Sequence, residues 1–157
     1  MLNNFIRYFI VVVIFVCLIS CKQNETYYQF AFIPKNEWAK NNEICFSLDS
    51  ISVNPLHKYT VSVEITHNIG YAYKNLWLYL DQTLQDTIPI RDTLNCTIID
   101  DNGKWEGVGN GPIRQLSVLY KTNIALDTTD IQRKICIRHA MQDFQLKGIE
   151  KIGLKID

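Results

Sequence analysis

The stretch KYTVSVEIT, residues 58–66, decides the fold class, because apolar and polar side chains alternate strictly along it. The apolar face of the stretch consists of Tyr59, Val61, Val63 and Ile65. A period of two with β-branched residues is typical of a strand that buries one face and exposes the other. We therefore predict a half-buried β-strand over this stretch.

The same two-residue period recurs along the chain after Tyr27, and turn-forming pairs such as Asn54-Pro55 separate the repeats. The further strand-like stretches are EICFSLD (43–49), NLWLYLD (75–81), DTLNCTIID (92–100), RQLSVLY (114–120), RKICIR (133–138) and KIGLKID (151–157). Strands at this spacing, without a long helical pattern, indicate an all-β fold. We predict a two-sheet antiparallel β-sandwich of the jelly-roll or Ig-like type, with at most a short helical turn near residues 139–144.

Two glycine-containing segments are predicted to be turns. The Asn-Gly pair within residues 98–106 tolerates positive φ at both central positions, which indicates a tight hairpin. Residues 107–111, GVGNG, resemble a phosphate-binding loop, but such a loop leads into the N-terminus of a helix. Pro112 and a strand-like stretch follow instead, so a turn that needs positive φ or close backbone approach explains these glycines better.

The N-terminal segment ends in a cleavage motif. Its apolar run from Tyr8 to Ser20 is about 13 residues long, shorter than the roughly 20 that cross a bilayer. The run follows the basic Arg7, as the hydrophobic region of a signal peptide does. Residues 18–21, Leu-Ile-Ser-Cys, read as a lipobox, in which small side chains fit beside the scissile bond and the cysteine sulfur accepts diacylglycerol.

We therefore predict residues 1–20 as a lipoprotein signal peptide and residues 21–26 as an acylated cysteine with a short tether. Residues 27–157 are predicted to form a single β-sandwich domain, near the commonest domain size. Several acyl chains on Cys21 would anchor the protein to a membrane without spanning it. Lys22 follows the anchor in place of an aspartate, which favours the outer membrane.

The charge balance argues against a nucleic-acid partner. The chain carries 16 Lys and Arg against 16 Asp and Glu. Loss of Arg7 with the signal peptide leaves the mature part close to neutral. No basic field and no acidic tail is present in the sequence, so no nucleic-acid partner is expected.

Three of the five cysteines remain once Cys17 is cleaved off and Cys21 is acylated. An odd number allows one disulfide with one thiol left over, or three buried thiols. Cys96 shares a strand face with Leu94 and Ile98, which predicts a buried thiol. Cys45 and Cys136 fall on the more polar faces of their strands, and they could pair if those strands are neighbours.

The sequence contains no recognisable catalytic or metal-binding set. His57, His67 and His139 lack the close spacing of metal ligands and are predicted to be surface or turn histidines. No nucleophile motif is present around any serine or cysteine. We therefore predict a protein that is not an enzyme, with no catalytic residues, no metal and no cofactor.

The aromatic side chains allow two interpretations. Trp77 and Tyr79 lie on the strand face opposite the leucines of residues 75–81, and Trp105 lies near a turn. Exposed aromatic rings on a sandwich can stack on sugars or anchor a protein partner. A strand that is apolar on both faces is usually covered on both, and large aromatic side chains are often substantially buried. We favour this second interpretation, which predicts buried rings.

Three stretches together resemble the GldH family of gliding-motility lipoproteins from Bacteroidetes. They are YYQFAFIPKNEWAKNNEICFSLD (27–49), GKWEGVGNGPIRQLSVLYK (103–121) and IRHAMQDFQLKGIEKIGLKID (137–157). The sequence departs from the family pattern at His139, where glutamine is common, and at Lys151, where an acidic residue is usual. The resemblance covers essentially the whole mature chain.

The resemblance implies a non-catalytic cell-envelope accessory of the gliding-motility or type IX secretion machinery, with envelope proteins as partners. The alternative is a glycan-binding β-sandwich module on the outer membrane. For the first hypothesis the predicted contacts lie in Trp105, the glycines of residues 107–111 and the segment 139–149; for the second they are Trp77, Tyr79 and Trp105. The candidate contact residues are therefore Trp77, Tyr79, Trp105, Gly107, Gly109 and Gly111.

Overall fold

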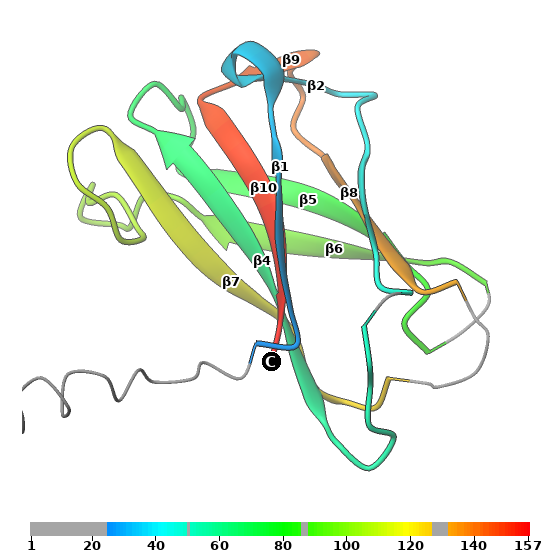
Figure 1. The fold of residues 1–157 in the computed structure, drawn as a ribbon. Coiled ribbons are helices and arrows are strands. Elements are labelled where there is room, and N and C mark those ends of the chain that lie inside the picture. Colours follow the sequence, from blue (N-terminus) through cyan, green and yellow to red (C-terminus); the bar gives the residue numbers. More distant parts are fainter. Residues whose placement is uncertain (1–24, 50, 86–87, 127–131) are drawn as a thin grey trace, which may run out of the picture.

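The computed structural model describes residues 25–49, 51–85, 88–126 and 132–157 (Figure 1). The predicted signal peptide, Cys21 and the tether up to residue 24 lie outside the described residues. Within the described part, the chain forms strands and one 3-10 turn, η1 (Pro34–Asn36). No helix in that part is long and apolar enough to cross a membrane.

Ten strands follow one another along the described chain. They are β1 (Tyr27–Phe32), β2 (Glu37–Ala39), β3 (Ile44–Ser47), β4 (Tyr59–Asn68), β5 (Asn75–Gln82), β6 (Ile90–Thr97), β7 (Ile113–Ile124), β8 (Lys134–His139), β9 (Gln145–Lys147) and β10 (Ile149–Ile156). Each of the seven stretches predicted from the two-residue period corresponds to one of them.

The strands pair in a nested order. Strand β1 pairs with β10, β2 with β9, β3 with β8, β4 with β7, and β5 with β6, all antiparallel. Two further antiparallel pairings, β10 with β4 and β5 with β8, join these strand pairs into two four-stranded sheets. The sheet orders are β1-β10-β4-β7 and β3-β8-β5-β6, and β2 and β9 form a separate ribbon. Of the two predicted sandwich types, this is the jelly roll.

The core lies between the two sheets, with β4, β7 and β10 in front of β5 and β6 in Figure 1. All four apolar residues of the 58–66 stretch are buried, and so are Leu76, Leu78 and Leu80 of β5. The β10 residues Ile152, Leu154 and Ile156 complete the layer opposite β5 and are fully buried. The buried faces predicted for these strands are thereby confirmed, whereas the polar face of the 58–66 stretch is not fully exposed, because Glu64 and Thr66 are buried as well.

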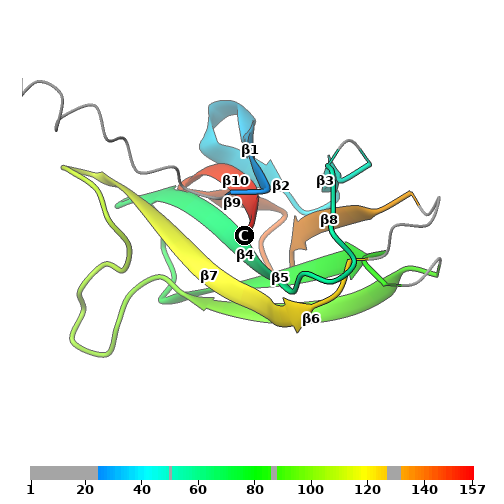
Figure 2. The same ribbon diagram turned by 60° about the horizontal axis from the view of Figure 1, so that its bottom comes forward.

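The sheets also meet along one edge, where β7 passes over β6 (Figure 2). The Tyr120 hydroxyl of β7 donates a hydrogen bond to the Asp92 carboxylate of β6. Lys121 Nζ lies 3.0 Å from the same carboxylate. These polar side-chain contacts join β7 of one sheet to β6 of the other.

The cysteine predictions are confirmed in the form of one disulfide and one buried thiol. Cys45 and Cys136 are directly opposite each other in the β3–β8 pairing and are disulfide-bonded. Cys96 is free and fully buried. Burial raises the pKa of its thiol to about 12, so Cys96 is neutral and unreactive.

The predicted hairpin at residues 98–106 is also confirmed. Ile99 and Trp105 form an antiparallel bridge, and the Asp100 N–H donates to the Lys104 carbonyl at 2.9 Å. The Asp100 carboxylate accepts hydrogen bonds from the backbone N–H groups of Asn102 and Lys104. Gly103 has φ +80°, as the Asn-Gly pair predicts, whereas Asn102 does not have the positive φ that was expected at both central positions.

Residues 139–144 do not form the helical turn that the sequence allowed. His139 ends β8, and the following residues form bends. Their backbone groups bind neighbouring segments instead: the Ala140 N–H donates to the Trp77 carbonyl, and the Phe144 carbonyl accepts from the Lys40 N–H. The described chain places its 3-10 turn at Pro34–Asn36, where proline begins the turn without losing a hydrogen bond.

Candidate interaction surfaces

Trp77 lies beside a shallow hollow on the outer face of the β3-β8-β5-β6 sheet. The alternation that buries the β5 leucines directs Trp77 outward, and 40% of its surface is exposed. The hollow has a volume of about 380 Å³ and is lined by Tyr73, Trp77, Ala140, Met141, Gln142 and Asp143. The structure thus brings Trp77 together with part of the predicted contact segment 139–149.

The rim of this hollow is held in place by polar contacts. The Tyr73 hydroxyl donates to the Asp143 carboxylate at 2.7 Å, and this hydrogen bond raises the pKa of Tyr73. The backbone N–H of Trp77 donates to the Met141 sulfur at 3.4 Å. The result is an amphipathic concave surface, with aromatic and thioether groups beside one carboxylate, of the kind that protein interfaces use.

Tyr79 lies on the same face two residues further along β5, but two arginine side chains lie over its ring. Arg138 and Arg91 place their guanidinium carbons 5.2 and 5.7 Å from the ring centroid. Arg91 also forms two hydrogen bonds with Asp81, at 2.7 and 2.6 Å. These bonds lower the pKa of Asp81. A sugar or partner that stacked on Tyr79 would have to displace at least one arginine from it.

Trp105 does not share a surface with Trp77. Its indole is only partly exposed and stacks on the imidazole of His67, with ring centroids 5.4 Å apart. His67 is buried on β4 of the other sheet, and its Nε2 lies 3.3 Å from the Glu106 carbonyl. This geometry makes Trp105 a cover over the edge of the core.

The glycines of residues 107–111 lie against the start of β7. Val108 and Gln115 exchange two backbone hydrogen bonds of 2.8 Å. A Cβ atom on Gly107, which has φ +90°, would lie 2.4 Å from the Gln115 carbonyl oxygen. Only glycine permits both this φ and this approach, as the turn interpretation predicts. Gly109 also approaches β7 closely, whereas Gly111 has open space around it.

The same glycine segment forms one side of a second hollow, on the outer face of the β1-β10-β4-β7 sheet. This hollow, of about 390 Å³, is lined by Glu25, Tyr28, Glu64, Gly107, Val108, Gln115, Ser117 and Lys155. Glu64 lies at the floor of this hollow and is only 3% exposed. Its carboxylate accepts hydrogen bonds from Ser117 Oγ at 2.5 Å and Gln115 Nε2 at 3.0 Å. Glu64 is therefore a satisfied buried acid that fixes β4 to β7.

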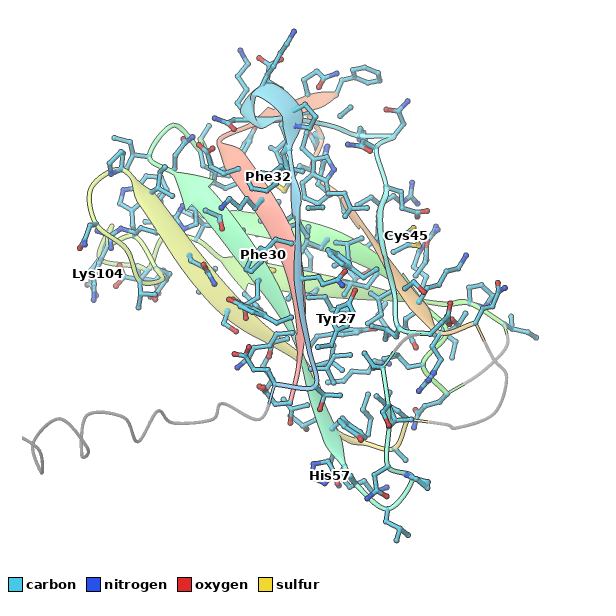
Figure 3. The ribbon with its side chains drawn as sticks, viewed as in Figure 1. Tyr27, Phe30, Phe32, Cys45, His57 and Lys104 are labelled. Atoms are coloured by element: carbon cyan, nitrogen blue, oxygen red, sulfur yellow. A yellow bond between two sulfur atoms is a disulfide. The ribbon has the colours of Figure 1, made fainter. Side chains whose placement is uncertain are left out.

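Sequence reasoning missed a row of aromatic side chains on β1. Tyr28, Phe30 and Phe32 alternate with Tyr27, Gln29 and Ala31, so they share the outer face of the sheet. Figure 3 labels Phe30 and Phe32 on this strand. Tyr28 and Phe32 are 42% and 74% exposed, and Phe30 covers Gly153 of β10. The period of two in YYQFAF was the signal that could have identified this row.

Two of the three histidines are buried, which contradicts their prediction as surface or turn residues. His67 and His139 are 0% and 1% exposed, whereas His57 is exposed in a turn as predicted. His139 Nε2 lies 3.0 Å from the Trp38 carbonyl. Burial lowers the pKa of both His67 and His139, so each ring is neutral and serves as a core residue with one polar contact.

One group of potential metal-ligating side chains is found in the described residues: Glu43, Cys45 and Cys136. The two sulfurs are joined to each other and are not thiolates. Because the thiolate is the form of cysteine that binds metals, this group lacks the ligands that its residue types suggest.

The fold and these surfaces define an all-β jelly-roll domain with shallow, partly aromatic hollows on both outer faces. The sequence profile described as "GldH lipoprotein" matches residues 25–156. The chain therefore belongs to the GldH lipoprotein family, as the three resembling stretches predicted.

Two curated relatives match over nearly their whole length. "Gliding motility lipoprotein GldH homolog" from Christiangramia forsetii is 28% identical over 156 residues, covering 95% of this chain and 93% of the relative. "Gliding motility lipoprotein GldH" from Flavobacterium johnsoniae is 22% identical over 149 residues, covering 90% of each chain.

Proposed function

We propose that this chain is a lipid-anchored, non-catalytic protein of the cell envelope that holds a partner of the gliding-motility or type IX secretion machinery at the membrane. The observation that carries the proposal is the family match over residues 25–156, which covers the whole sandwich and begins four residues after the lipobox cysteine. Both relatives have "gliding motility lipoprotein" in their names. The outer membrane is the proposed location, because lysine and not aspartate follows Cys21.

The chemistry of the described residues supports a non-catalytic role. His67 and His139 each use Nε2 to contact a backbone carbonyl within the fold. Ser117 donates to Glu64, but a lone carboxylate without a histidine between them is a poor base for activating a hydroxyl group. Cys96 is buried and protonated. These groups stabilise the sandwich and are not arranged around a reacting atom.

The proposed partner surface is the hollow beside Trp77, together with residues 140–143. An exposed tryptophan beside methionine and a tyrosine is the composition expected of an interface hot spot. The carboxylate of Asp143 on the rim would favour a partner that presents a basic or hydrogen-bond-donating side chain there. The predicted contacts at Tyr79, Trp105, Gly107, Gly109 and Gly111 stay secondary candidates.

The test is crosslinking in intact cells, followed by purification of the acylated protein and identification of what is crosslinked to it. Three proteins are compared at matched abundance: wild type, Cys21→Ala and Trp77→Ala. We expect wild type to enrich secretion or gliding components, Cys21→Ala to lose them with the anchor, and Trp77→Ala to lose them while still floating with membranes. Equal enrichment by all three proteins would refute both the anchor and the surface.

Glycan binding is the second candidate, because Trp77 offers a partly exposed ring beside a concave surface. Aromatic rings of this kind stack on the apolar faces of sugars. Titration of the purified protein with envelope polysaccharide, monitored by tryptophan fluorescence, tests it. Saturable binding that Trp77→Ala abolishes would favour this candidate over a protein partner. A flat titration for wild type would remove it.

A further inference from the structure

The turn formed by Asn54–Lys58 is held by backbone hydrogen bonds and is exposed to solvent. The backbone N–H of Leu56 donates to the Asn54 side-chain oxygen at 2.9 Å, and the His57 N–H donates to the Asn54 carbonyl at 3.0 Å. The Asn54 N–H donates to the Tyr59 hydroxyl at 2.8 Å, which fixes the turn to the start of β4. Leu56, at the tip, is nevertheless 91% exposed. The turn therefore holds an apolar side chain in water in a defined conformation.

This turn lies at the end of the sandwich from which the chain leads to the lipobox cysteine. The Thr26 N–H donates to the Ile156 carbonyl, and Asp157 and Thr60 exchange hydrogen bonds of 3.0 and 3.1 Å. The start of β1, the chain end and the start of β4 are therefore side by side. Figure 3 shows His57 at this end of the molecule and Phe32 at the other.

The length of the intervening chain limits how far this end can lie from the bilayer. Glu25 lies four positions after Cys21, with three residues between them, and an extended chain covers at most about 3.4 Å per position, or about 14 Å in all. The ten-residue strand β4 then carries Ile69 to the opposite end, about 33 Å away. An acylated Cys21 would therefore keep the 54–58 turn near the membrane surface, whereas Ile69 could remain far from it.

The composition of the tip matches a bilayer surface. Pro55 and Leu56 are apolar and exposed, and the exposed His57 and Lys58 follow directly. An apolar side chain that enters the acyl boundary, with a cationic one beside it among the headgroups, is the arrangement used by interfacial segments. Lys58 would add attraction to anionic lipids, which is screened by salt.

We propose that the 54–58 turn is a second membrane contact, in which Leu56 inserts into the lipid interface and Lys58 meets the headgroups. This inference rests on the proposed lipid anchor at Cys21. With two contacts, the anchor and the turn, the sandwich stands with β4 directed away from the bilayer and loses its freedom to rotate on the tether. The contact fixes which end of the domain faces outward to partners.

The experiment uses the lipidated full-length protein in vesicles that contain anionic and zwitterionic phospholipids. An environment-sensitive fluorophore is attached to Leu56→Cys, and Ile69→Cys serves as the matched control, because Ile69 is also exposed, at 59%, but at the far end. Cys96 is fully buried and Cys45 is bonded to Cys136, so the introduced thiol is the labelled one. Quenching by nitroxide-labelled lipids and the emission wavelength are measured on the vesicle-bound fraction after flotation.

We expect blue-shifted emission and several-fold stronger quenching at position 56 than at position 69. If the fluorophore reports an aqueous environment at both positions, although the protein floats with the vesicles, the second contact is overturned while the anchor stands. If both are quenched equally, the domain lies on its side, and the upright orientation is overturned. If the lipidated protein does not float, the anchor and the contact both fail.

Discussion

Cys45 on β3 and Cys136 on β8 face each other across neighbouring antiparallel strands, with their Cα atoms 4.0 Å apart and their sulfurs bonded. The bridge joins residues that are 91 positions apart in the sequence. Strand β3 is short and lies at the edge of its sheet, paired on one side with β8. The disulfide therefore fixes covalently an edge strand that has few backbone hydrogen bonds of its own.

Reduction of this disulfide should destabilise the domain by about 2–4 kcal/mol, because the bridge restricts a long loop in the unfolded chain. Urea unfolding with and without excess reductant measures the change. The double variant Cys45→Ala/Cys136→Ala is the matched control and should give the same midpoint under both conditions. A wild-type midpoint that does not respond to reductant would show that the bridge contributes little.

Gly148→Ala should cost about 3 kcal/mol or more, since the new Cβ atom would lie 2.5 Å from the Tyr71 backbone nitrogen and φ is +88°. Gly111→Ala is the control, because φ is +72° there but no atom lies within 4 Å. That substitution should cost only about 1–2 kcal/mol for the left-handed conformation. Both are measured as shifts in the urea midpoint. Equal costs would mean that the contact with Tyr71 is relieved by a small movement.

The domain should lose stability as the pH falls through about 6.5. Burial holds the pKa values of His67 and His139 below their ordinary value in the folded state. The unfolded chain therefore binds protons in this range that the folded chain does not, and acidification favours unfolding. Urea midpoints at about pH 7.5 and about pH 5.5 test this, with a lower midpoint expected at the acidic value.

His139→Gln should reduce that difference between the two pH values, although it lowers stability at both. The glutamine side chain does not titrate, so one source of the linkage is removed. The comparison separates the proton effect from the packing cost, because the packing cost is present at either pH. An unchanged pH dependence in this variant would assign the effect to other groups.

Trp105→Ala and Trp77→Ala should separate a stability role from a binding role. Trp105 stacks on the buried His67, so its removal should cost about 2 kcal/mol. Trp77 is 40% exposed at an open hollow, and its removal should cost less than about 1 kcal/mol. Urea unfolding measures the loss of stability in each variant, and recovery of crosslinked partners measures the loss of binding. Partner loss with Trp105→Ala at full stability would move the proposed surface to the other sheet.

Local sequence patterns predicted the strands and their buried faces well, and this holds for Val61 and Val63 as much as for Leu76 and Leu78. They failed where a residue's environment depends on another segment. Glu64 alternates as a solvent-facing residue, yet Gln115, Ser117 and the 107–108 backbone cover it. His67 is buried because Trp105 stacks on it from a hairpin nearly forty residues away.

The candidate site was only partly predictable for the same reason. The period of two along β5 placed Trp77 on the face opposite the leucines, but the favoured prediction that this face is covered was wrong for Trp77, which is 40% exposed. Its neighbours Tyr73 and Met141 come from segments that meet it only in the folded sheet. The capping of Tyr79 by Arg91 and Arg138 depends on cross-strand register, which an isolated stretch does not specify.

The sequence by itself determined the class of fold and the family, because each is encoded in short stretches whose meaning does not depend on distant residues. The lipobox, which is encoded in the same way, stays a prediction. The tertiary structure alone decided the nested pairing from β1 with β10 inward to β5 with β6, and with it the jelly roll. It also decided that Cys45 meets Cys136 and which aromatic rings stay exposed. These features arise from contacts between strands far apart in the chain, where geometry and mutual burial choose among pairings that local propensity leaves equivalent.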